Sequence, residues 1–103
     1  MRIILKDCEY DINSPTVEIE KIDDETVLYF TDEEKIAVLN CTATVIWKII
    51  TVALKNKQLV IILDEIIEKF EKIVDISNFD SSEIELDIES IIKQFIENGI
   101  FIY

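Results

Sequence analysis

Lys35-Ile36-Ala37-Val38-Leu39-Asn40-Cys41-Thr42-Ala43-Thr44-Val45-Ile46-Trp47 is the stretch that decides the fold of this 103-residue chain. Residues 35–39 are short, apolar and partly β-branched, which predicts a β-strand. From Ala43 onward, apolar residues recur at steps of three and four, which predicts an amphipathic helix. Asn40 or Thr42 can begin that helix, because a side-chain oxygen there accepts a hydrogen bond from a free backbone N–H. The strand therefore passes directly into the helix.

Two further strands are expected upstream of this stretch. Residues 16–20 alternate apolar and polar side chains, and residues 26–31 are rich in β-branched and aromatic ones. Short acidic turns separate these segments from each other and from the strand at 35–39, so the three should form an antiparallel meander. One more strand is expected at residues 2–5.

Two helices are expected downstream. Residues 59–74 keep apolar side chains in phase with a helix, and Ser81 or Ser82 caps a third helix that ends at Gly99. The last residues, 100–103, are apolar and should fold back onto the body of the protein. The fold class is thus α+β: a three-stranded antiparallel sheet followed by three helices, winged helix-turn-helix-like, in one domain spanning residues 1–103.

One apolar run does not fit a helix well. Leu59-Val60-Ile61-Ile62-Leu63 contains five consecutive apolar residues, and one helix cannot turn all of them toward one core. Val60 or Ile61 is therefore expected to be exposed, and the patch at these two residues to dock a partner enzyme or a second copy of the protein. The alternative is that residues 100–103 cover them.

The net charge of −12 is unevenly distributed. Residues 1–34 carry three basic and eleven acidic side chains, residues 35–79 six and five, and residues 80–103 one and six. The two acidic parts repel phosphate backbones, and the last helix opposes four carboxylates with only Lys93. Binding to DNA as a winged-helix regulator is therefore not expected, because recognition helices present basic and amide side chains.

Catalysis is not expected either. The chain has no His, no Gly-rich phosphate loop and no metal-ligating Cys spacing, so we expect no enzyme, no metal and no cofactor. Cys8 and Cys41 are isolated and fit small, partly buried side chains in a reducing compartment. No segment has the length of a membrane span or the pattern of a signal peptide, so a cytoplasmic protein without membrane contact is expected.

The stretch from Ile36 to Ile50 resembles the strand–helix junction of the PqqD-like family, with Leu-Asn-x-Thr-Ala followed by an apolar pair ending in Trp. The last helix is similar to the closing helix of that family, with Asp87-Ile88, the apolar pair Ile91-Ile92, and the exit Gly99-Ile100. The likeness covers most of the chain from Thr16. The chain departs from the family between the first two helices, where a Gly- or Pro-containing turn is usual and this sequence has neither.

The resemblance implies a function. PqqD-like domains, also called RiPP recognition elements, bind the leader of a ribosomally synthesised precursor peptide and present it to a modifying enzyme. They do so by β-strand addition to the third strand. Lys35, Ile36, Ala37, Val38 and Leu39 would then supply the backbone ladder, and the facing wall would come from Ile84, Asp87, Ile88 and Ile91. Asp87 would pair with a basic residue of the leader or cap a backbone group.

The resemblance leaves the identity of the partners open. The modifying enzyme is a radical SAM maturase, a leader protease or a cyclase. The alternative from another class is an acidic protein-interaction module of winged-helix type, acting as an anti-regulator or a DNA mimic.

Overall fold

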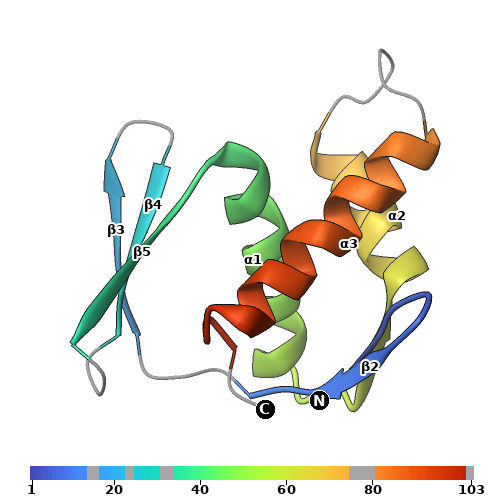
Figure 1. Ribbon diagram of the computed structural model, residues 1–103, viewed down its shortest axis with the longest axis horizontal. Helices are drawn as coiled ribbons and strands as arrows, with labels where there is room; N and C mark the ends of the chain where they lie inside the picture. Colours follow the sequence, from blue (N-terminus) through green and yellow to red (C-terminus); the bar gives the residue numbers. More distant parts are fainter. Residues whose placement is uncertain (14–16, 23–24, 31–33, 75–80, 102–103) are drawn as a thin grey trace.

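The computed structural model describes residues 1–13, 17–22, 25–30, 34–74 and 81–101. Figure 1 shows a sheet on one side of the molecule and the three helices gathered beside it. In chain order the elements are β1 (Arg2–Ile4), β2 (Glu9–Asp11), β3 (Val17–Ile22), β4 (Glu25–Phe30), β5 (Lys35–Leu39), α1 (Cys41–Lys55), β6 (Val60–Ile62), α2 (Leu63–Ile73) and α3 (Ser81–Glu97).

The expected meander is confirmed. Strands β3, β4 and β5 form an antiparallel sheet in that order, with Leu28 at its centre paired to Ile19 and Ala37. Thr26, Leu28 and Phe30 of β4 are buried on the face that α1 covers. Among the described residues β5 is paired with β4 alone, so it is an edge strand of the described sheet.

The N-terminal residues form a second small sheet that was only partly expected. Strand β1 pairs antiparallel with β2 and parallel with β6, in the order β2-β1-β6. The strand predicted at residues 2–5 is thus confirmed, whereas its partners were not foreseen. The described residues contain six strands, of which β2 and β6 were not predicted from the sequence.

The helix predicted from residue 59 is wrong at its start. Residues 60–62 are strand β6, and helix α2 begins at Leu63. Strand geometry resolves the apolar run, because successive side chains point to opposite faces: Ile61 is fully buried, whereas Val60 and Ile62 are each a little over 40% exposed. Val60 is therefore exposed and Ile61 is not, so the two residues do not form an exposed patch together.

The C-terminal end of α3 is closed as the sequence predicts. Gly99 adopts a left-handed conformation with φ of 70°, and the N–H groups of Gly99 and Ile100 donate to the carbonyls of Ile96 and Phe95. Ile100 and Phe101 then turn back into the core, where the Phe101 ring meets Phe95 edge to face at 5.9 Å. Residues 102–103 lie outside the described part.

The structure therefore has an α+β architecture with three helices and a three-stranded antiparallel meander. Its apolar side chains form a continuous core cluster that joins both sheets to the helices. Within the described residues, none of the helices has the length and apolar character needed to cross a membrane.

The register of β6 predicts opposite outcomes at neighbouring positions. Replacing Ile61 with Ala should lower the free energy of unfolding by about 2–5 kcal/mol, because it empties a fully buried site. Replacing the exposed Val60 with Ala should cost less than about 1 kcal/mol. Urea unfolding of the two variants measures both values. Equal losses would contradict the strand assignment.

Candidate functional site

A cavity of about 500 Å³ lies along the edge strand β5, between that strand and the C-terminal half of α3. We call it the edge groove. Its walls come from β5, from the start of α1 and from α3 with the residues that follow it. The lining residues are Lys35, Ile36, Ala37, Val38, Leu39, Asn40, Ala43, Ile91, Gln94, Phe95, Asn98 and Ile100.

The junction between β5 and α1 fixes one wall of the edge groove. Asn40 has an extended backbone, and its side-chain oxygen accepts a hydrogen bond of 2.8 Å from the N–H of Ala43. Thr44 donates its hydroxyl to the carbonyl of Asn40 at 2.8 Å. A single residue therefore separates strand from helix, and α1 begins at a fixed angle to the edge strand.

Strand β5 presents a free edge and two different faces. In an antiparallel pair, only alternate residues hydrogen-bond to the neighbouring strand through their N–H and C=O groups. The N–H and C=O groups of the intervening residues of β5 therefore point away from β4. Ile36 and Val38 lie on the outer face and are 63% and 57% exposed. On the inner face Leu39 is buried, and Lys35 and Ala37 are partly buried. The edge thus offers backbone groups flanked by apolar side chains.

Small side chains account for the volume of the edge groove. Ala37 on β5 and Ala43 at the start of α1 line it, and both end at Cβ. Opposite them Ile91 is partly buried and Phe95 is buried. A larger residue at position 37 or 43 would occupy the space that the two alanines leave.

Lys35 closes one end of the edge groove. Its ammonium group donates a 2.9 Å hydrogen bond to the carbonyl of Asn98 and lies 4.8 Å from the centre of the Phe30 ring. A Cβ at position 99 would lie 2.8 Å from this ammonium, so Gly99 also makes room for Lys35. Among the described residues that line the groove, Lys35 is the only charged one. The acidic character of the chain is therefore not reproduced inside the groove.

The predicted facing wall is displaced along α3. Ile91 lines the edge groove as expected, but Ile84 and Ile88 are buried in the core and Asp87 is exposed outside the lining. The rest of the wall comes from Gln94, Phe95 and Asn98, which follow Ile91 by one to two turns toward the C-terminus. The sequence places 84, 88, 91, 92 and 95 in one apolar stripe, and only the crossing of α3 with β5 decides which of them face the strand.

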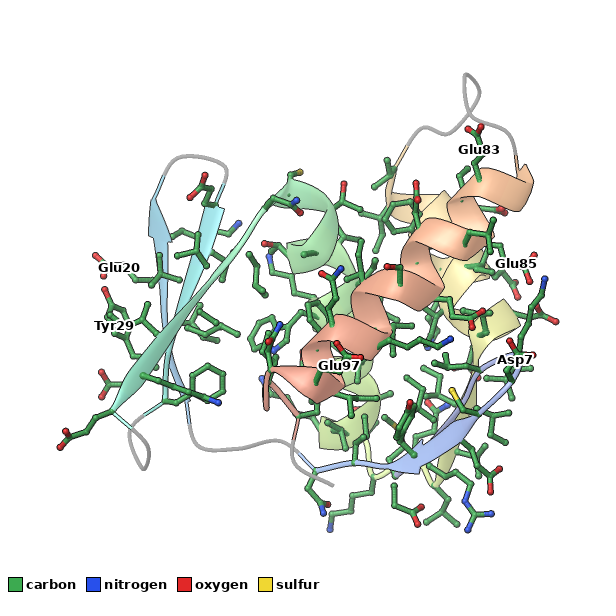
Figure 2. All side chains as sticks on the ribbon, viewed as in Figure 1. Asp7, Glu20, Tyr29, Glu83, Glu85 and Glu97 are labelled. Atoms are coloured by element: carbon green, nitrogen blue, oxygen red, sulfur yellow. The ribbon has the colours of Figure 1, made fainter. Side chains whose placement is uncertain are left out.

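The outer face of the meander is acidic. Glu18, Glu20 and Glu25 are exposed there, and the Tyr29 hydroxyl donates to the Glu20 carboxylate at 3.0 Å (Figure 2). That hydrogen bond, with repulsion by the carboxylate, raises the pKa of Tyr29. Figure 2 also shows Glu83 and Glu97 near opposite ends of α3. Among the described residues, no carboxylate lines the edge groove.

The described residues contain no group of three or more His, Cys, Asp or Glu side chains placed to hold a metal ion. Cys8 and Cys41 are free thiols; Cys8 is partly buried as expected, whereas Cys41 is exposed at the start of α1, so the expectation is wrong there. Comparison of the chain with known protein families, characterised proteins and solved structures finds no match.

Lys35 should hold the end of α3 against β5. Replacing it with Met should lower the free energy of unfolding by about 1 kcal/mol, because the hydrogen bond to Asn98 and the contact with Phe30 are lost. Amide exchange at the end of α3 should accelerate. The matched variant Lys72→Met removes an exposed pair with Glu68 and should cost about 0.5 kcal/mol or less. Equal losses would show that Lys35 has no such role.

Proposed function

We propose that this protein is a peptide-binding adaptor that receives the leader of a ribosomally synthesised precursor peptide by β-strand addition to β5. The observation that carries the proposal is a cavity with a mixed apolar and polar lining that runs along an edge strand whose alternate backbone groups are directed outward. A peptide strand satisfies those groups and at the same time buries its own side chains.

The geometry of β5 indicates what the bound peptide looks like. Alternate side chains of the added strand enter the edge groove, where Ala37 and Ala43 leave room for large apolar anchors. The intervening side chains lie beside Ile36 and Val38 on the outer face. The favoured segment is therefore extended and apolar at every second position, with further apolar contacts on the other face.

The resemblance of residues 36–50 and 87–100 to PqqD-like domains supports the same proposal. On this account the fold is a winged helix-turn-helix derivative in which the edge of the sheet, and not a helix, meets the ligand. The protein acts in the cytoplasm without chemistry of its own and delivers the leader to a radical SAM maturase, a leader protease or a cyclase.

An NMR titration tests the binding directly. The ¹⁵N-labelled protein is mixed with synthetic leader segments of the short peptides encoded beside its gene. Shifts should concentrate in residues 35–39 and 91–100, and β3, the opposite edge, should not respond. Shifts centred on β3 or on the second sheet, or no shifts with any of these leaders, would overturn the proposal.

Filling the edge groove should separate binding from folding. Ala37→Leu adds a side chain where the cavity lies, so the protein should stay folded while affinity for the leader falls at least about tenfold. Ile19→Ala, which trims an exposed apolar side chain on β3, should leave the affinity unchanged. Isothermal titration calorimetry and thermal unfolding measure the two properties. Undiminished affinity in Ala37→Leu would contradict the assigned site.

A further inference from the structure

A mainly apolar depression, separate from the edge groove, lies between α1 and α2 and is bordered by lysines. Its volume is about 360 Å³, and its lining residues are Lys48, Ile49, Val52, Lys69, Lys72 and Ile73. We call it the lysine surface. Val52 is 52% exposed and Ile73 61%, so the floor is open to solvent. It contains three of the ten basic residues of a chain with a net charge of −12.

The positive charge of the lysine surface is only partly compensated. Lys69 pairs with Glu65 at 3.2 Å and Lys72 with Glu68 at 3.6 Å, each along α2. Lys48 has no carboxylate partner among the described residues and lies beside a second ammonium group, that of Lys21. The neighbouring Lys21 ammonium repels a second positive charge and so lowers the pKa of Lys48. A carboxylate placed here would relieve that repulsion.

The size and surroundings of the lysine surface favour a protein segment as its occupant. A nucleic acid or an anionic membrane extends well beyond a depression of this size and meets the acidic remainder of the protein. A second copy carries the same net charge of −12 and is repelled as a whole. A narrow segment senses mainly the charges within about 8 Å, the screening length at physiological salt.

The lysine surface and the edge groove can be occupied at the same time. Ala43 lines the groove and Lys48 the lysine surface, and five residues correspond to a rotation of about 140° around α1. The two sites therefore lie on different flanks of one helix. A ligand in one leaves the other accessible.

We propose that the lysine surface docks an acidic segment of the modifying enzyme that also carries apolar side chains. The carboxylates of that segment meet Lys48 and Lys72, and its apolar residues cover Ile49, Val52 and Ile73. This inference rests on the proposed function, because the enzyme is the second partner of a leader-binding adaptor. The adaptor thereby holds the leader at one side of α1 and the enzyme at the other.

Calorimetry with the modifying enzyme encoded beside the gene tests the inference. Lys48→Glu and Val52→Ser should each weaken enzyme binding about tenfold or more, because one introduces repulsion and the other removes apolar contact. Lys57→Glu makes the same change in net charge outside the lysine surface and should leave the affinity unchanged. Affinity for the leader should be that of the unaltered protein in all three.

The two proposals fail differently. If Lys48→Glu and Val52→Ser bind the enzyme as tightly as the unaltered protein and still bind the leader, only the docking role of the lysine surface is overturned. The same holds if the unaltered protein binds the leader but does not bind the enzyme. Binding to vesicles of phosphatidylserine that Lys48→Glu abolishes would replace the protein segment with a membrane. Absence of leader binding would remove the proposed function, and this inference with it.

Discussion

The hydrogen bonds at the junction of β5 and α1 are the constraint on which the rest of the structure depends. Asn40 satisfies the N–H of Ala43, and Thr44 binds back to the carbonyl of Asn40, so no flexible residues intervene between edge strand and helix. Because α1 packs on both β4 and α3, its direction determines how far α3 stands from β5. The width of the edge groove is therefore set by the junction.

The fold tolerates its excess of acidic residues in part because lysines pair with two of the carboxylates on α3. Lys6 pairs with Glu85 at 2.8 Å and ties the loop after β1 to α3, and Lys93 pairs with the buried Glu89 at 2.9 Å. Other carboxylates of the described residues are spread over the outer face of the meander, β2, α2 and α3. Repulsion between copies then disfavours association through the exposed edge of β5. Without that repulsion, the exposed apolar side chains of Ile36 and Val38 would favour pairing of two copies.

Local sequence predicted the meander, the bounds of β5 and the left-handed Gly99, because each depends on neighbouring residues. It narrowed the cap of α1 to Asn40 or Thr42, of which Asn40 is the cap. It failed at residues 59–63, where pairing with β1, distant in sequence, gives the run a strand geometry. It also misplaced the wall of the edge groove, since Ile84 and Ile91 belong to the same helical stripe. Which of them meets β5 depends on a crossing angle between elements far apart in the chain. The lysine surface, likewise, combines residues of α1 and α2 that no local pattern connects.

Residue-resolved amide hydrogen exchange of β5 tests the central claim, strand addition at this edge, most directly. In the free protein, exchange should alternate along residues 35–39, slow where the N–H binds β4 and fast where it points outward. With a saturating leader peptide, the fast set should slow at least about tenfold while the exchange of β3 stays unchanged. Uniform protection of β5 without peptide, or outward amides that remain fast with peptide bound, would contradict the account.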